Sequence, residues 1–233
     1  MSGAAPRDSI GRRIGTNGRR RARPVGACDD ELVSDGPRSD NQSVTIGPWR
    51  RHTRRLAYEN DWITVWHDVV TRPDGGAGIY GLVHFANLAA GVVVLDDADR
   101  VLLVGQHRYT IDAMSWEIPE GGVGSGETPL EGIARELREE TGVEAGSWRE
   151  IGRVHLSNSV SDETGVIWAA RSLSIGRAAP EPTEQIEVRW VPFDEALAMT
   201  LDGRITDAMS VIGIQRVALG RAGDGEASGA GTD

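Results

Sequence analysis

Three glutamates in the middle of the chain, Glu136, Glu139 and Glu140, stand at spacings that would place their carboxylates close together on a helix. Like charges three and four residues apart repel by roughly 0.2–0.5 kcal/mol per pair in an isolated helix, so the cluster is unfavourable by itself. A hard divalent cation reverses that sign, and carboxylate oxygens suit Mg²⁺ or Mn²⁺, which bridge to substrate phosphates. The segment is therefore a candidate metal site for phosphate chemistry, and a solvated helix face is the competing interpretation.

A glycine-rich loop at residues 121–127 comes directly before these glutamates. Glycine permits positive φ and a close approach of the backbone to a ligand, as a phosphate-lining loop requires. Thr128 and Glu131 form a T-x-x-E capping box, and Gly142 is a typical helix terminator. The spacing predicts a helix over 129–141 that follows the loop at once.

The loop and the helix together match the pattern G-x5-E-x7-R-E-U-x-E-E-x-G-U over 23 residues, where U is an aliphatic residue. With this pattern the chain resembles the Nudix hydrolases. The matching residues are Gly121, Glu127, Arg135, Glu136, Leu137, Glu139, Glu140, Gly142 and Val143. The resemblance implies an α/β (α+β) fold, the Nudix α/β/α sandwich, and a hydrolase that uses Mg²⁺ or Mn²⁺ to cleave a nucleoside diphosphate linked to another group.

The resemblance assigns the metal to glutamates of this loop and helix. Glu136 and Glu140 are expected as the principal ligands, with Glu139 in support. The backbone carbonyl of Glu120 is expected as a further ligand. The number of metal ions stays open.

Two residues of the pattern are expected to act without touching the metal. Arg135 would orient the carboxylates for catalysis. Glu127 would form an ion pair that fixes Arg135 or its neighbours, as partners of metal ligands commonly do.

Residues outside the pattern indicate a branch of the family. The leading pair of strands and residues 106–109 (Gln-His-Arg-Tyr), 116–121 (Trp-Glu-Ile-Pro-Glu-Gly) and 161–163 (Ser-Asp-Glu) together resemble the ADP-ribose pyrophosphatase type. That branch implies a small N-terminal antiparallel β domain that helps build a homodimer. It also implies that Glu163, on a mobile loop, is the base that activates water. Glu139 is the alternative base, and an exposed loop acid is the competing interpretation of Glu163.

Four residues are candidates for contact with the substrate. Gly121 and Gly122 belong to the expected phosphate-lining loop. Arg108 is a candidate for a phosphate contact, and Glu117 for a ribose or metal contact. An internal ion pair is the alternative for both charged residues.

The resemblance makes hydrolysis of a nucleoside diphosphate sugar the leading hypothesis, with ADP-ribose first, giving AMP and a sugar phosphate. The branch often has Ser-Pro-Gly ahead of its loop acid, whereas residues 157–159 here are Ser-Asn-Ser, so other nucleoside diphosphate sugars stay open. Nucleoside triphosphates, dinucleoside polyphosphates and capped RNA are the alternatives within the family. A non-catalytic ligand sensor is the alternative outside catalysis, and the complete set of glutamates argues against it.

Composition is typical of a cytoplasmic enzyme. The chain has 233 residues and a formal net charge of −10, which disfavours non-specific binding to nucleic acid. It contains no apolar run long enough to predict a membrane span. Cys28 is the only cysteine, so an intrachain disulfide is excluded, and all 25 basic residues are arginine, so a lysine base is excluded.

Four segments are predicted along the chain. Residues 1–44 form an arginine-rich arm that is predicted to be disordered, with a transit peptide or a polyanion-binding arm as alternatives. Residues 45–87 form the small β domain, 88–220 the hydrolase domain, and 221–233 a flexible tail. Strands are expected at 62–70, 79–85, 89–95, 101–104, 150–155, 165–170 and 186–191, and helices at 193–201 and 205–219.

Overall fold

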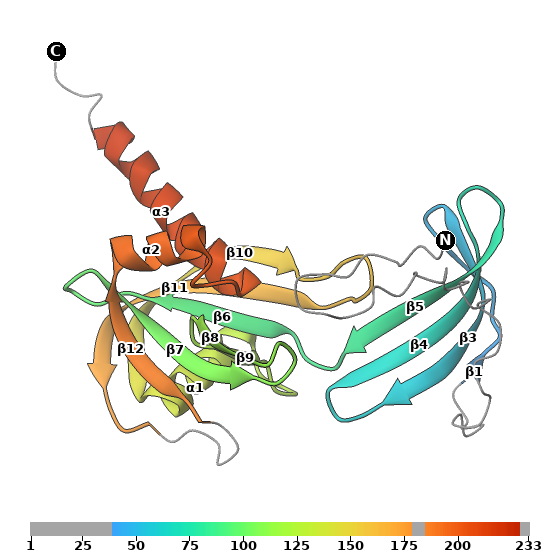
Figure 1. The fold of residues 1–233 in the computed structure, drawn as a ribbon, viewed down its shortest axis with the longest axis horizontal. Coiled ribbons are helices and arrows are strands. Elements are labelled where there is room, and N and C mark those ends of the chain that lie inside the picture. Colours follow the sequence, from blue (N-terminus) through green and yellow to red (C-terminus); the bar gives the residue numbers. More distant parts are fainter. Residues whose placement is uncertain (1–38, 179–184, 229–233) are drawn as a thin grey trace, which may run out of the picture. The chain divides into compact units, whose positions relative to one another are not determined.

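The computed structural model of the protein describes residues 39–178 and 185–228, which fold into three sheets and three helices (Figure 1). Each strand expected from the sequence is present, and the predicted mixed fold class is confirmed. Within the described residues, no helix combines the length and the apolar character that crossing a membrane requires.

The N-terminal sheet has the strand order β1-β3-β4-β5, and β2 pairs with β3. Its strands are β1 (Ser39–Asp40), β2 (Val44–Ile46), β3 (Trp49–Glu59), β4 (Ile63–Thr71) and β5 (Ala77–Phe85). The sequence analysis missed β3, because its run of arginines hides any alternation of apolar residues. The guanidinium of Arg54 in β3 donates hydrogen bonds of 2.8 and 2.7 Å to the carboxylate of Asp68 in β4. The sequence of β3 alone cannot show this partner.

The predicted disordered arm ends earlier than residue 44. Residues 39–40 form β1, which pairs with β3, and residue 44 begins β2. The backbone N–H and C=O groups of β1 bond to β3. The side chains of this stretch do not by themselves predict a strand. The remainder of the predicted arm, residues 1–38, lies outside the described residues.

Two further sheets make up the hydrolase domain. The four-stranded sheet has the order β10-β11-β6-β9, and the three-stranded sheet has the order β12-β7-β8. Their strands are β6 (Ala89–Val94), β7 (Arg100–Arg108), β8 (Ala113–Glu117), β9 (Glu120–Gly122), β10 (Val143–His155), β11 (Thr164–Ile175) and β12 (Glu187–Pro192). β6 runs parallel to β11 and antiparallel to β9, so it joins the glycine-rich loop to the centre of the domain.

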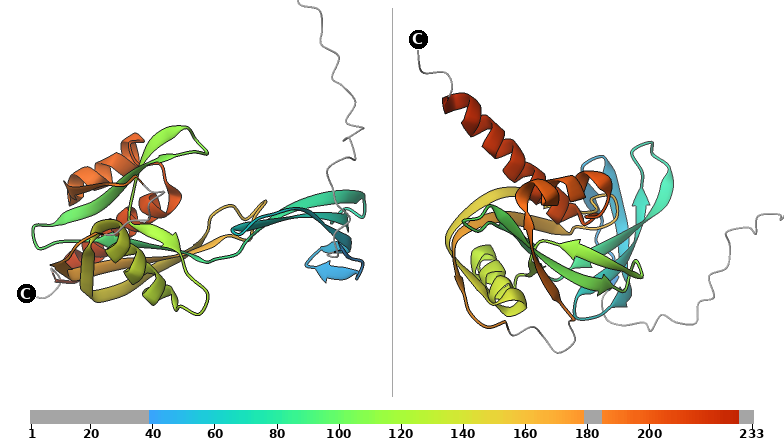
Figure 2. Two further views of the ribbon diagram at one scale, coloured as in Figure 1. Left: turned by 90° about the horizontal axis from the view of Figure 1, so that it is seen from below. Right: turned by 60° about the vertical axis from the view of Figure 1, so that its left-hand side comes forward.

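Strand β6 is a continuous apolar run because both of its faces are buried. Val92 and Val94 belong to one hydrophobic core with helix α1 (Pro129–Thr141). Val93 belongs to a second core with α2 (Phe193–Asp202) and α3 (Ala208–Ser228). The sheets therefore lie between α1 on one side and α2 with α3 on the other (Figure 2).

Helix α1 spans 129–141, as predicted, because its ends are fixed by local chemistry. The side chain of Glu131 accepts a hydrogen bond of 2.8 Å from the backbone N–H of Thr128, and the Thr128 side chain accepts one from the N–H of Glu131. Gly142 ends the helix in the left-handed conformation with φ of 71°, and its N–H donates to the carbonyl of Arg138. These caps hold the glutamates of α1 in register with the loop before it.

Helix α3 continues to Ser228, past residue 219 where the sequence predicted its end. Arg221 holds this part of the helix in place: it forms an ion pair with Asp99 and lies 3.6 Å over the ring of Phe193. The predicted flexible tail therefore includes helical residues 221–228, and residues 229–233 lie outside the described part of the chain.

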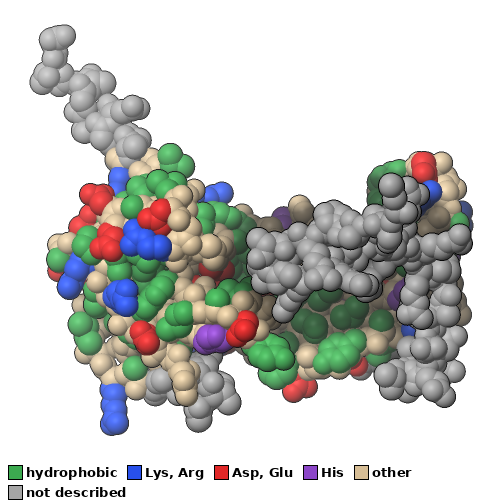
Figure 3. Space-filling view, viewed as in Figure 1, with side chains coloured by type: hydrophobic (Ala, Val, Ile, Leu, Met, Phe, Trp, Pro, Cys, Tyr) green, Lys and Arg blue, Asp and Glu red, His purple; other side chains and the backbone are tan. Residues whose placement is uncertain are grey.

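Large apolar side chains are exposed on the N-terminal sheet. On one face of this sheet, Tyr58 is 55% exposed, Val69 42% and Ile79 69%. Figure 3 shows hydrophobic side chains gathered over this sheet. Such a surface is a candidate for contact with another protein chain.

Candidate active site

Arg135 ties together the carboxylates that the motif brings close to it. Its guanidinium donates to both oxygens of Glu127, at 2.9 and 3.0 Å, and to Glu136 and Glu139 at 2.9 and 3.1 Å. It also donates to the backbone carbonyl of Gly122 at 3.1 Å. One cation on α1 thus fixes the positions of three carboxylates and of the glycine-rich loop.

The ion pair with Arg135 dominates the electrostatics of Glu127. Hydrogen bonds from the Arg135 guanidinium and the N–H of Gly124 lower the pKa of Glu127 to about 2. The pKa of Arg135 is raised, first by Glu127 and then by Glu136 and Glu139. Glu127 has the position expected of a residue that fixes Arg135.

Glu136 lies directly against the glycine-rich loop. A Cβ atom built on Gly121 would lie 2.4 Å from Cδ and 2.6 Å from Oε1 of Glu136. A side chain at position 121 would therefore displace this carboxylate from its place. The close approach, rather than a positive φ, is what position 121 requires of glycine.

Glu140 lies one turn further along α1 and is buried, with 5% of its surface exposed. Its charge contributes to raising the pKa of Glu120, so the two carboxylates are electrostatic neighbours. Glu140 thus links the glutamates of α1 electrostatically to a second group of acids, which includes Glu120.

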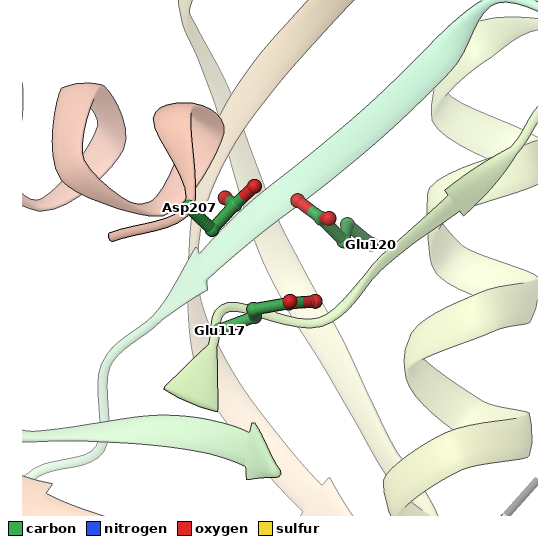
Figure 4. A group of neighbouring side chains, drawn as sticks. All are labelled: Glu117, Glu120 and Asp207. Atoms are coloured by element: carbon green, nitrogen blue, oxygen red, sulfur yellow. The ribbon is translucent and has the colours of Figure 1, made fainter. Parts of the chain in front are cut away.

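That second group consists of Glu117, Glu120 and Asp207, whose carboxylates point toward a common centre (Figure 4). One oxygen from each of the three lies within 4.8 Å of the others. Burial raises the pKa of Glu120 well above its usual range, and the charges of Asp207 and Glu117 raise it further. The Oε2 atom of Glu120 is buried without a hydrogen-bond partner in the structure.

The sequence analysis missed Asp207. This residue precedes α3, where its carboxylate accepts a hydrogen bond of 2.7 Å from the N–H of Ser210. An aspartate before a helix is visible in the sequence as an N-cap, but its proximity to Glu117 and Glu120 depends on the tertiary fold. The side chain of Glu120 was missed as well, since only its backbone carbonyl was expected at the site.

Arg108 and Glu117 are held by one another. The Nε atom of Arg108 donates to Oε1 of Glu117 at 2.9 Å, and a second guanidinium nitrogen donates to Oε2. Arg108 also lies 3.4 Å from Glu120, and its pKa is raised, first by Glu117. This is the internal ion pair that the sequence left as the alternative for both residues.

A cleft of about 660 Å³ opens beside these acids. Its walls include Arg108, Glu120, Glu163 and Asp207, together with Trp62 of the N-terminal sheet. Arg108 is the one basic side chain among the described residues that line it. An acidic cleft of this size with one arginine suits an anionic ligand that arrives with a cation.

Glu163 lies immediately before β11 and faces this cleft, as the expected loop acid would. Burial raises the pKa of Glu163, and the nearby charge of Asp207 adds to the effect. A carboxylate with a raised pKa is a stronger base once it has lost its proton. The cleft thus brings together Glu163, Glu120 and Asp207 with Gly121 and Gly122 of the glycine-rich loop.

Comparison with known proteins gives two family matches. The NUDIX domain matches residues 86–209, and the nucleoside diphosphate sugar hydrolase N-terminal domain matches residues 49–83. The second match covers most of the N-terminal sheet.

Curated relatives include two hydrolases. A CMP-5'-(N-acetyl-N-hydroxy-3-aminopropyl)phosphonate hydrolase of Streptomyces rubellomurinus is 31% identical over 169 residues, which are 72% of this chain and 82% of that protein. An ADP-ribose pyrophosphatase of Mycobacterium tuberculosis is 32% identical over 154 residues, which are 64% of this chain and 73% of that protein.

A solved structure described as an ADP compounds hydrolase aligns with a TM-score of 0.68 at 18% identity. The alignment covers 75% of this chain and 95% of that one, so the two share a fold.

Proposed function

The chain belongs to the Nudix family of hydrolases, and on that premise we propose that it cleaves the diphosphate of a nucleoside diphosphate sugar, with ADP-ribose as the first candidate. The observation that carries the proposal is the common cleft. It places the glycine-rich loop and the acids beside Trp62, which belongs to the N-terminal domain typical of nucleoside diphosphate sugar hydrolases. The reaction would consume one water and give AMP and ribose 5-phosphate.

A divalent cation fits the residues that surround this cleft. The buried Oε2 atom of Glu120 has no hydrogen-bond partner, and Asp207 and Glu117 hold unfavourable negative charge next to it. The motif assigns Mg²⁺ or Mn²⁺ to Glu136 and Glu140, supported by Glu139 and the carbonyl of Glu120. The side chains of Glu120, Glu117 and Asp207 form a second set of oxygens close enough together to hold a cation. When bound, the cation would neutralise charge on the diphosphate oxygens.

The chain's own residues have separate roles in the proposed reaction. Glu163 accepts the proton of the attacking water, whose oxygen forms a bond to one phosphorus while the bond from that phosphorus to the bridging oxygen breaks. Arg135 keeps the carboxylates of α1 in place through its four hydrogen-bonded partners. Arg108, held by Glu117, presents a guanidinium to a phosphate.

A second candidate substrate is a cytidine nucleotide linked to a phosphonate. The relative from Streptomyces rubellomurinus favours it, because its name describes the hydrolysis of such a compound. The chemistry at the reacting bond is similar, so the two substrates differ mainly in the groups on either side of it.

We propose a homodimer built on the N-terminal sheet. The exposed side chains of Tyr58, Val69 and Ile79, on one face of the sheet, support it, since burial of such apolar surface stabilises association. Light scattering coupled to gel filtration measures the mass directly. A mass of one chain, 25.0 kDa, at micromolar concentration would contradict the proposal.

The function is tested by a hydrolysis panel in Mg²⁺ with products separated by chromatography. The panel contains ADP-ribose, other nucleoside diphosphate sugars, a CMP-linked phosphonate, dinucleoside polyphosphates and nucleoside triphosphates. Turnover of ADP-ribose to AMP and ribose 5-phosphate, abolished by chelation of the metal, is the expected result. Turnover confined to triphosphates, or no turnover of any compound, would overturn the proposed substrate class.

A further inference from the structure

The loop at residues 157–162, which leads to Glu163, lies along the free edge of β5. The N–H of Val83 donates to the carbonyl of Val160 at 2.8 Å, and the N–H of Asp162 donates to the carbonyl of Val83 at 3.2 Å. This is a parallel β-bridge between Val83 and Ser161. The hydroxyl of Tyr80 also donates to the carbonyl of Ser159 at 2.6 Å. The loop is thus joined to the edge strand of the N-terminal sheet by one β-bridge and by the Tyr80 hydroxyl.

Asp162 supplies the side-chain part of this attachment. Its Oδ2 atom lies 2.6 Å from Nδ1 of His84, and its Oδ1 atom accepts a hydrogen bond of 3.1 Å from the N–H of Phe85. His84 and Phe85 are the last two residues of β5. One carboxylate therefore fixes the loop to the end of this strand through both of its oxygens.

The position of Asp162 next to Glu163 matters because adjacent side chains of an extended chain point to opposite sides. Asp162 faces the N-terminal sheet, and Glu163 faces the cleft. The carbonyl of Glu163 accepts a hydrogen bond of 3.2 Å from the N–H of Leu156, which closes the loop at its base. Because the two residues are adjacent in an extended segment, the bonds that fix the Asp162 side chain also fix the direction of the Glu163 side chain.

We propose that Asp162 and His84 are positioning residues that hold Glu163 at the cleft, so that the N-terminal sheet controls the placement of the base. This inference rests on the proposed function, in which Glu163 accepts the proton of the attacking water. Within the loop, the turn formed by Ser157 with Val160 and Ser161 uses backbone bonds only, so it should remain when the Asp162 side chain is removed. The loop then keeps its turn, its backbone bonds to Val83 and the bond from Tyr80, and it loses the two bonds of the Asp162 carboxylate to His84 and Phe85.

Asp162→Ala is the main test. With ADP-ribose and saturating Mg²⁺, kcat should fall by at least about 10-fold, a part of the 10²–10⁴-fold that a general base contributes, while KM stays within about twofold. Asp162→Asn keeps an oxygen that accepts from Phe85 and a group that can bond His84, so it should recover most of kcat. His84→Ala, which leaves the bond to Phe85, should give an intermediate loss.

Asp74→Asn is the matched control. Asp74 forms an ion pair with Arg72 in the turn between β4 and β5, at the opposite end of the same strands. The substitution makes the same change of charge without touching the loop. Its kcat should equal that of the wild type.

Two further measurements separate this inference from the proposed function. Hydrogen exchange should become at least about 10-fold faster at residues 157–163 in Asp162→Ala, whatever the substrate is. In a Glu163→Gln background, Asp162→Ala should cause no further loss of kcat, because both changes act through the same base. Unchanged exchange, or an equal loss of kcat in both backgrounds, would overturn the positioning role. Absence of turnover by the wild type would overturn the proposed function. The hydrogen-exchange rates at residues 157–163 would then still test whether Asp162 fixes the loop to β5.

Discussion

Gly121→Ala tests the link between the glycine-rich loop and the metal-binding helix. The new Cβ would lie 2.4, 2.6 and 2.7 Å from Cδ, Oε1 and Cγ of Glu136. Ordinary contacts are 3.4–4 Å, so the carboxylate must retreat by about 1 Å. A misplacement of about 1 Å at a catalytic site costs on the order of 100-fold in rate, which equals about 2.7 kcal/mol. The φ of Gly121 is not positive, so the fold should tolerate alanine.

The assay is the rate of ADP-ribose hydrolysis as a function of Mg²⁺ concentration. We expect kcat/KM to fall about 100-fold and half-saturation to need more Mg²⁺, because Glu136 leaves its place as a ligand. Gly81→Ala is the control, since a Cβ on Gly81 meets no atom within 4 Å. Wild-type kcat/KM and Mg²⁺ dependence in Gly121→Ala would refute the reasoning that the loop fixes Glu136.

Three other predictions follow from the site. Glu140→Gln should lose most turnover and keep its circular dichroism spectrum, since the volume stays and a ligand charge is removed; normal turnover at saturating Mg²⁺ would contradict the assignment. Glu163→Gln should lower kcat by about 10²–10⁴-fold with unchanged Mg²⁺ affinity. The wild-type rate should fall as pH drops through the raised pKa of Glu163, and the rate of this variant should not show that fall. The pKa of Glu127, about 2, lies below its usual 4.5, so the stability that Glu127 adds is present above pH 4.5 and lost as pH falls toward 2. Thermal unfolding of Glu127→Gln should therefore depend less on pH in this window than that of the wild type, and equal slopes would contradict the prediction.

The family and the fold class could be predicted from the sequence because their signals are local. The caps of α1, Thr128 with Glu131 at one end and Gly142 at the other, depend on residues within a few positions of one another. The motif has the same property, so its glutamates could be placed on one helix before any tertiary contact was known.

Other parts of the site could not be predicted because they depend on pairs distant in sequence. Asp207 joins Glu120 only after α3 packs on the sheet, and no local spacing relates the two. The attachment of Asp162 to His84 likewise joins a loop of the hydrolase domain to a strand of the N-terminal sheet. The sequence could identify Glu163 as a candidate base but not the contacts around it.

Asp207 has two structural tasks, and this restricts how the position can change in evolution. Its carboxylate caps α3 through the N–H of Ser210, and it adds negative charge beside Glu120. Asparagine, serine and threonine also cap helices well, whereas alanine costs about 1 kcal/mol at such a position. Substitutions at position 207 that preserve the helix cap are thus confined to a few short polar residues. Each of these replacements removes the negative charge of aspartate. A lineage that changes the electrostatics of the cleft at this position can do so in one nucleotide step, aspartate to asparagine, without first finding a compensating change in the helix.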